Sequence, residues 1–256
     1  MTDTREPTPR LGPHGLWCSL PTTYATEILA RSGFDWLCVD LQHGFFTAGD
    51  LLSVMQTADA TATPVLVRVE HPESLVIHRA LDAGARGIIF PSIETGEQAA
   101  RAAALCRYPP RGVRSWGPAR LMLGKPDYTP ASADDDALCF VMIESRRALD
   151  NLDDILTVDG VDGVLVGPSD LAIDQGLPPS PLPVEGRHRQ ALAHIAAQAS
   201  ERGVIPAVFA DSPQGVHAYR ELGYELFGVG NDAGLLRSAA LHLLQQLQRA
   251  ELPDPV

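Results

Sequence analysis

The chain contains almost no lysine: Lys125 is the only one among 256 residues. Acidic residues outnumber Lys and Arg, and the formal net charge is -12 at pH 7. Proteins that bind nucleic acid concentrate Lys and Arg on one surface, so we expect no nucleic-acid partner. Lys125 lies in a polar segment and not at the end of a predicted strand. A mechanism that uses a Schiff-base lysine is therefore not expected.

Cysteine and long apolar runs are also scarce. The four cysteines, Cys18, Cys38, Cys106 and Cys139, lie far apart and form no CxxC pair, which argues against a zinc site. They are expected to be buried thiols in a reducing cytoplasm. No apolar run approaches the length of a membrane span, and residues 1–9 are polar. We therefore expect a cytoplasmic protein with no membrane partner.

What the sequence does contain is a regular alternation of short apolar segments with helical patterns. The apolar segments cover residues 15–20, 36–41, 64–69, 87–93, 138–144, 163–166, 204–210 and 226–230. Strands that are apolar almost throughout are covered on both faces, which is typical of parallel α/β proteins. Eight such units predict a closed (β/α)₈ TIM barrel. An open doubly wound sheet is less favoured, because no glycine-rich dinucleotide turn follows an early strand.

The same pattern predicts the organisation of the chain. Residues 1–14 are expected to form a loose N-terminal arm, and residues 15–256 a single barrel domain. Residues 108–137 are rich in Pro, Gly, Arg and Asp and are expected to form one long loop. Long loops in compact domains are usually functional or lie in interfaces.

Ionisable side chains follow several of the predicted strands. Asp40 and His43 follow the second strand, Arg68 ends the third, Glu144 the fifth, and Asp170 follows the sixth. Taken singly, each could form a salt bridge or cap a helix. In a TIM barrel, however, the carboxyl ends of all strands meet at the face that carries the active site. The five residues together therefore predict a site.

Glu144 and Asp170 follow adjacent strands, so their carboxylates can lie close together. Two such groups repel each other unless they share a proton or bind a cation. A hard dication such as Mg²⁺ or Mn²⁺ suits them and leaves positions for water and substrate. A two-carboxylate glycosidase is the alternative, but it gives His43 and Arg68 no clear role.

At this point several motifs carry a family resemblance. They are Asp40-Leu-Gln-His43-Gly, Val-Arg68-Val, Leu81-Asp82-Ala-Gly-Ala-Arg-Gly, Tyr108-Pro-Pro-Arg-Gly-Val-Arg-Ser, Ile143-Glu144 and Val166-Gly-Pro-Ser-Asp170-Leu. In this order they resemble the class II pyruvate-dependent aldolases, the 2,4-dihydroxyhept-2-enedioate and hydroxy-ketoacid aldolase family. The resemblance extends from Gly15 to about Leu236.

The resemblance implies a (β/α)₈ barrel whose C-terminal helix packs on a neighbouring subunit, in a homohexamer built as a trimer of dimers. It implies a divalent metal, Mg²⁺ or Mn²⁺ with Co²⁺ as an alternative, on Glu144 and Asp170. His43 would be the catalytic histidine, with Asp82 or Asp40 as its acidic partner. Arg68 would hold the enolate oxygen of the substrate.

The implied reaction is the reversible cleavage of a 4-hydroxy-2-keto acid into pyruvate, or a related 2-keto acid, and an aldehyde through a metal-stabilised enolate. The N–H groups of Ser169 and Asp170, beside Gly167, are suited to hold the substrate carboxylate at a helix start. Gln42 and Met142 are also expected at the substrate. They depart from the family pattern, because relatives often have Glu at the first position and the bicarboxylate-active members have Gln at the second.

Two other functions remain open. A lyase that acts on hydroxyacyl-CoA thioesters would need a basic groove, for which four arginines in and near the long loop are candidates: Arg101, Arg107, Arg111 and Arg114. A non-catalytic 2-keto-acid binding protein is the other alternative. The remaining histidines, His188 and His194 among them, are expected to be ordinary surface or packing residues.

Overall fold

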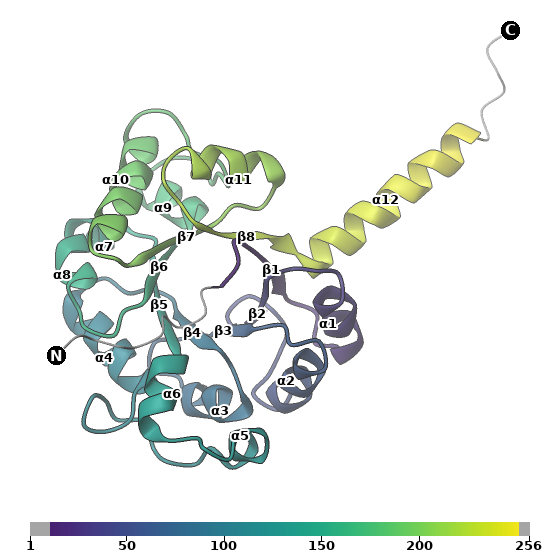
Figure 1. Ribbon diagram of the computed structural model, residues 1–256. Coiled ribbons are helices and arrows are strands. Elements are labelled where there is room, and N and C mark those ends of the chain that lie inside the picture. Colours follow the sequence, from purple (N-terminus) through teal and green to yellow (C-terminus); the bar gives the residue numbers. More distant parts are fainter. Residues whose placement is uncertain (1–10, 251–256) are drawn as a thin grey trace, which may run out of the picture.

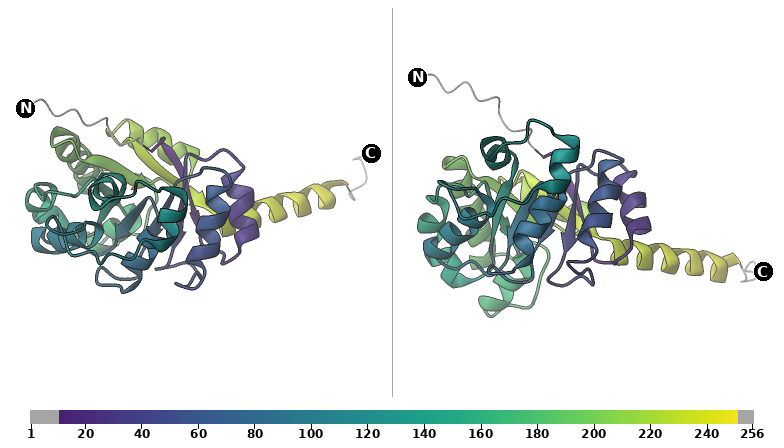
Figure 2. Two further views of the ribbon diagram at one scale, coloured as in Figure 1. Left: turned by 60° about the horizontal axis from the view of Figure 1, so that its bottom comes forward. Right: turned by 90° about the horizontal axis from the view of Figure 1, so that it is seen from below.

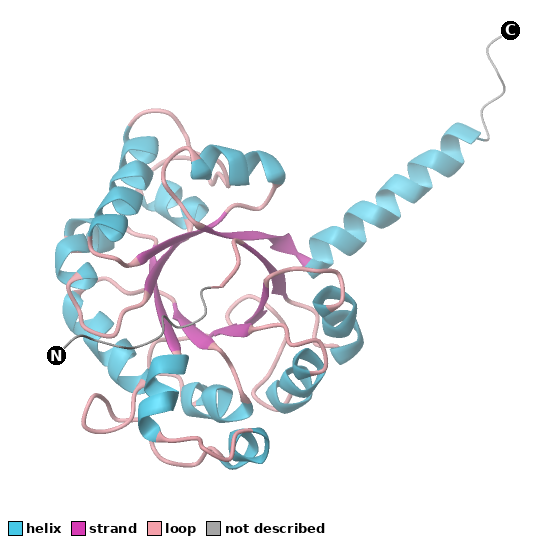
Figure 3. Ribbon diagram, viewed as in Figure 1, coloured by secondary structure: helices cyan, strands magenta, loops and turns pink. Residues whose placement is uncertain are grey.

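A closed barrel of eight parallel strands lies at the centre of the computed structural model, which describes residues 11–250 (Figures 1 and 3). The strands are β1 (His14–Cys18), β2 (Trp36–Asp40), β3 (Val65–Arg68), β4 (Gly87–Phe90), β5 (Leu138–Ile143), β6 (Gly163–Val166), β7 (Ile205–Phe209) and β8 (Leu226–Asn231). Each strand pairs with the next along the chain, and β8 returns to pair with β1. The predicted TIM barrel is confirmed.

Helices surround the barrel and cover the outer faces of the strands (Figure 3). In the described part of the chain they are α1 (Thr23–Ala30), α2 (Leu51–Asp59), α3 (Val76–Ala83), α4 (Gly96–Cys106), α5 (Ala119–Gly124), α6 (Pro130–Asp136), α7 (Arg146–Asp150), α8 (Leu152–Leu156), α9 (Pro168–Asp174), α10 (Arg187–Glu201), α11 (Pro213–Arg220) and α12 (Asp232–Ala250). None of them is long and apolar enough to cross a membrane.

The inside of the barrel is filled by large side chains, so the barrel is a packed core and not a pore. Trp17, Trp36 and Phe140 belong to this interior cluster and are buried. Glycine makes room for them: a Cβ on Gly15 would lie 2.1 Å from the Trp36 ring. A second, larger apolar cluster joins the outer faces of the strands to the helices.

The segment 108–137 is not one long loop, as the sequence predicted, because it contains α5 and α6. Thr129 caps α6 by accepting a hydrogen bond from the Ser132 N–H at 3.1 Å. Asp134 in α6 is buried and accepts the Tyr108 N–H at 2.8 Å. Both helices are short and lack an apolar stripe, which explains why periodicity did not reveal them.

The C-terminal helix α12 leaves the barrel and projects away from it (Figures 1 and 2). Its exposed leucines are Leu235, Leu236, Leu241, Leu243, Leu244 and Leu247. At the other end of the chain β1 begins at His14, so the barrel starts one residue earlier than predicted. Residues 1–10 of the predicted arm, and 251–256 of the predicted domain, lie outside the described residues.

Candidate active site

A cavity of about 390 Å³ opens at the carboxyl ends of the strands. It is lined by Trp17, Ser19, Asp40, His43, Arg68, Met142, Leu165, Gly167, Pro168, Ser169, Asp170, Phe209 and Asn231. Most of the side chains that the sequence singled out thus lie around one space. Strand polarity explains this, because eight parallel strands all end on the same face.

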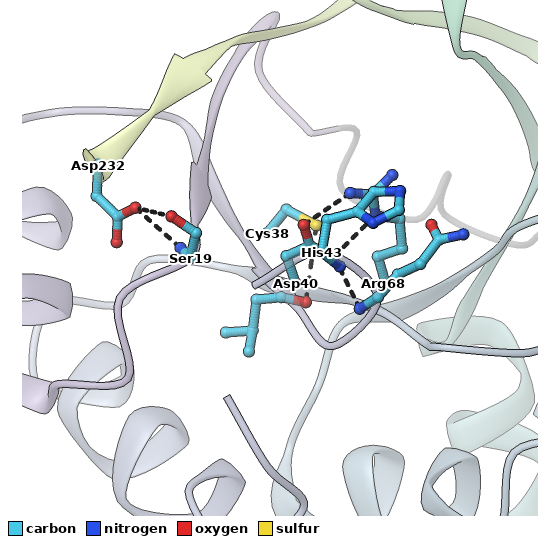
Figure 4. Close-up of polar contacts among 8 residues, drawn as sticks. Ser19, Cys38, Asp40, His43, Arg68 and Asp232 are labelled. Carbon is cyan, nitrogen blue, oxygen red and sulfur yellow. Dashed lines mark hydrogen bonds and ion pairs between the residues drawn. The ribbon is translucent and has the colours of Figure 1, made fainter. Parts of the chain in front are cut away.

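Asp40 and Arg68 form a buried ion pair at this cavity (Figure 4). They are register partners at the ends of β2 and β3, so their side chains start next to each other. Arg68 donates from Nε to Asp40 Oδ1 at 2.9 Å and from Nη2 to Oδ2 at 2.6 Å. The side chains are only 12% and 4% exposed. A bidentate pair of this kind fixes the direction of the guanidinium.

Asp40 also organises the loop after β2. Its Oδ1 accepts the backbone N–H of Gln42 at 3.0 Å and that of His43 at 3.2 Å. The carboxylate therefore holds both the arginine and the loop that carries the histidine. Within the described residues, the His43 ring itself is hydrogen-bonded to neither Asp40 nor Asp82, and its side chain is exposed at the cavity.

The charge on Arg68 is stabilised by its surroundings. Burial disfavours the guanidinium cation, but the hydrogen bonds and the charge of Asp40 outweigh this and raise the pKa of Arg68. The negative charge of Glu144 also raises the pKa of Arg68. Arg68 also lies over the Trp17 ring, 5.9 Å from its centroid. This gives the cavity a permanently positive group with a fixed orientation.

Glu144 and Asp170 face a common space above Gly167. A Cβ built on Gly167 would lie 3.2 Å from Oδ2 of Asp170 and 3.2 Å from Oε2 of Glu144. The missing side chain thus leaves the gap between the two carboxylates open. Burial raises the pKa of Glu144, and the nearby Asp170 adds to this effect. Two carboxylates that converge in a partly buried position form a natural ligand pair for a cation.

Ser92 is a residue of this site that the sequence did not reveal. Its backbone N–H donates to Glu144 Oε1 at 2.7 Å. The predicted fourth strand ran to residue 93, but β4 ends at Phe90 and Ser92 adopts a φ of 56°. A positive φ in a residue other than glycine is uncommon and often marks a functional position. Side-chain patterns carry no signal for such a backbone turn.

A second polar contact closes the barrel beside the cavity. Asp232, at the start of α12, accepts the backbone N–H of Ser19 at 2.9 Å and that of Leu20 at 3.0 Å, as well as the Ser19 hydroxyl (Figure 4). These bonds join the end of β1 to the end of β8. The cavity wall formed by Ser19 and Asn231 is therefore connected to the N-terminal end of α12.

Two other predicted residues lie away from the cavity, and a third, Met142, lies in its lining. Asp82 lies in α3, where its Oδ1 accepts from Arg114 Nη2 at 2.8 Å, so within one chain it does not support His43. Gln42 is not part of the cavity lining, and its buried Oε1 has no hydrogen-bond partner in the described part of the chain. Met142 does line the cavity and is buried.

Of the four arginines considered for a CoA groove, only Arg101 and Arg111 are exposed. Arg107 is buried and donates to Asp162 at 2.8 Å, and Arg114 is buried against Asp82 and the Tyr108 ring. Arg101 is exposed and pairs with Glu97 in its own helix. The guanidinium groups of Arg107 and Arg114 thus form ion pairs inside the fold and are not exposed at the surface.

Known proteins resemble this chain over most of its length. A 5-keto-4-deoxy-D-glucarate aldolase from Klebsiella pneumoniae is 36% identical over 239 residues, covering 92% of each chain. A 4-hydroxy-2-oxo-heptane-1,7-dioate aldolase from Escherichia coli is 34% identical, covering 88% of this chain and 87% of its own.

Among solved structures, an HpcH/HpaI aldolase/citrate lyase family protein from Burkholderia cenocepacia superposes with a TM-score of 0.85 at 34% identity. The match covers 93% of this chain and 95% of that one. The family model described as HpcH/HpaI aldolase/citrate lyase matches residues 14–239. The chain therefore belongs to the HpcH/HpaI aldolase/citrate lyase family.

Proposed function

We propose that the protein is a divalent-metal aldolase that reversibly cleaves 4-hydroxy-2-keto acids into a 2-keto acid, such as pyruvate, and an aldehyde. The observation that carries this proposal is the pair Glu144 and Asp170, whose carboxylates border one open space beside Arg68 and His43. Aldol cleavage requires a proton acceptor for the hydroxyl group and stabilisation of the negative charge that develops on the keto oxygen. This set of side chains offers both.

The donor set at Gly167 fits a hard dication. Two carboxylate oxygens suit Mg²⁺ or Mn²⁺, with Co²⁺ as an alternative, and Gly167 has no side chain that would crowd the two oxygens. The described residues contain no cluster of three or more His, Cys, Asp or Glu side chains placed to bind a metal. The remaining positions would thus fall to water and to substrate oxygens. A bound dication would supply Lewis-acid polarisation of the keto group.

The protein's own residues divide the remaining tasks. Arg68, held rigid by Asp40, would donate to the keto oxygen where negative charge develops, and rigid donors of this kind are the most effective. The backbone N–H groups of Ser169 and Asp170, in the first turn of α9, would bind the substrate carboxylate. His43 would take the proton of the 4-hydroxyl in cleavage and return it in condensation.

The aldehyde would occupy the rest of the cavity. Its wall there is apolar and aromatic, with Trp17 and Phe209 packed edge to face at 5.2 Å between ring centroids and Met142 beside them. The Met142 thioether cannot donate a hydrogen bond to a substrate oxygen, whereas an amide could. We therefore infer that this chain accepts a different range of aldehydes from members with Gln at this position.

The projecting helix supports self-association. In proteins, most of the stability of a helix comes from packing its apolar face against other residues. The α12 leucines are about half exposed, with values between 42% and 66%. We propose that a second copy of the chain covers them, in an oligomer for which a hexamer is the expected form.

The test is a cleavage assay on purified protein after EDTA treatment and after reloading with Mg²⁺ or Mn²⁺. A 4-hydroxy-2-keto acid should release pyruvate only from the reloaded protein, and a hydroxyacyl-CoA thioester should not be cleaved. Full activity after EDTA treatment would exclude the metal mechanism. Cleavage of the thioester alone would favour the CoA lyase, and binding without turnover would favour a keto-acid binding protein.

A further inference from the structure

His188 is a buried histidine whose two ring nitrogens are both engaged. It lies in the first turn of α10 and has no exposed surface. The Val184 N–H donates to its Nδ1 at 3.0 Å, and its Nε2 lies 3.0 Å from the carbonyl oxygen of Pro168. Because Nδ1 accepts a hydrogen bond, the proton of the neutral ring is on Nε2, which then donates to Pro168. From the sequence, His188 was expected to be only an ordinary surface or packing residue.

Pro168 belongs to the turn that carries the candidate metal ligand. This turn consists of Gly167, Pro168, Ser169 and Asp170, and it leads from β6 into α9. The first turn of α9 is not capped by a side chain, since its N-cap residue is Gly167. A helix start without a side-chain cap lacks one of the hydrogen bonds that usually hold its first turn in place. The bond from His188 supplies an attachment from outside the helix.

The same histidine connects the turn to two other segments. Val184 belongs to the polar connection between α9 and α10, and its carbonyl oxygen accepts the Arg189 N–H at 2.9 Å. The N-terminus of α10 also lacks a side-chain cap, because Gly186 precedes it. The imidazole therefore lies where the β6–α9 turn, the connection and α10 meet.

We propose that His188 is a positioning residue of the active site. Through Pro168 it holds the Gly167–Asp170 turn so that the Asp170 carboxylate stays opposed to Glu144 over Gly167. The role in metal binding rests on the function proposed above. The role as an attachment of the turn does not depend on that function, and it can be measured in the metal-free protein.

Three substitutions separate the two hydrogen bonds of the ring. In His188→Gln, the amide can accept from Val184 and donate to Pro168, so both bonds survive. In His188→Asn, the shorter amide can still accept from Val184 but does not reach Pro168. His188→Leu removes both bonds and keeps the apolar volume. His194→Leu is the matched control, because His194 is exposed on the same helix.

The first measurement is amide hydrogen exchange across residues 167–174 in the metal-free protein, with peptides from β2 and β3 as internal references. Exchange in this segment should rise in His188→Asn and His188→Leu and stay at the wild-type level in His188→Gln and His194→Leu. The second measurement is Mn²⁺ affinity. Loss of a group that orients a metal ligand typically weakens metal binding by about 10-fold to 100-fold, so His188→Asn should bind Mn²⁺ at least tenfold more weakly.

The outcomes are distinct. Wild-type exchange across 167–174 in His188→Asn would overturn the proposal, even if the melting temperature fell, because His188 would then only fill space. His188→Asn decides the question if His188→Leu does not fold. If the wild-type protein binds no Mn²⁺ and cleaves no 4-hydroxy-2-keto acid, the proposed function fails. The exchange data still decide whether His188 fixes the turn.

Discussion

Replacing Arg68 by alanine should damage stability and activity by different routes. The change leaves the Asp40 carboxylate, only 4% exposed, with two backbone N–H donors and no cation. Breaking a buried ion pair by removing one partner costs about 3–5 kcal/mol. Activity should fall by about 10²–10³-fold in kcat/KM, the scale of losing one oxyanion donor. Most of this loss should appear in kcat, because the interaction strengthens as charge develops.

A double substitution separates the two effects. Asp40→Asn keeps an oxygen that can accept from the Gln42 and His43 N–H groups but removes the buried charge. Asp40→Asn/Arg68→Ala should therefore recover part of the unfolding free energy that Arg68→Ala loses, without recovering activity. Urea denaturation at one fixed protein concentration and steady-state kinetics measure the two quantities.

An unfolding free energy of Arg68→Ala within about 1 kcal/mol of the wild-type value, the usual range of an exposed ion pair, would refute the structural role of this contact. A double variant no more stable than Arg68→Ala would refute it as well. An effect confined to KM would contradict the role of the guanidinium at the developing charge.

Three further predictions concern the metal ligand, its backbone support and the projecting helix. Because burial raises the pKa of Glu144, the ionised carboxylate destabilises the metal-free fold above that pKa. Glu144→Gln should therefore raise the melting temperature of the metal-free protein at neutral pH, and this gain should shrink as the pH falls through the pKa of Glu144. The same substitution should abolish the stabilisation of the protein by Mn²⁺. Ser92→Gly should keep Mn²⁺ affinity and stability, whereas Ser92→Val, strained at a φ of 56°, should lower the melting temperature and weaken Mn²⁺ binding in calorimetry. Leu243→Asp/Leu244→Asp should lower the molecular mass measured by light scattering, and an unchanged mass would remove α12 from the interface.

The barrel could be predicted from the sequence because its signal is repeated eight times. Each buried strand is an apolar run, and errors of one to three residues at its ends do not change the topology. The strand ends also predicted that Asp40, Arg68 and Asp170 lie around one cavity, because residues at or just after the carboxyl ends of parallel strands share one face of the barrel.

What the sequence could not predict depends on backbone conformation and on contacts between distant segments. The turn at Ser92 is set by a left-handed φ, which the residue types of the strand do not encode. The Pro168–His188 contact joins residues 20 positions apart, and the Ser19–Asp232 contacts join residues 213 positions apart. Asp82 was linked to His43 by resemblance, but its position in α3 brings it to Arg114.

The most direct test of the account is Mn²⁺ binding, measured by titration calorimetry, to the wild type, Glu144→Gln and Asp170→Asn. Asp174→Asn is the matched control, because Asp174 ends the same helix but is exposed and bonded to Arg146. We predict one Mn²⁺ per chain in the wild type and in Asp174→Asn, and loss of binding in the other two variants. Unchanged Mn²⁺ binding in both Glu144→Gln and Asp170→Asn would contradict the central claim that these two carboxylates together hold the metal.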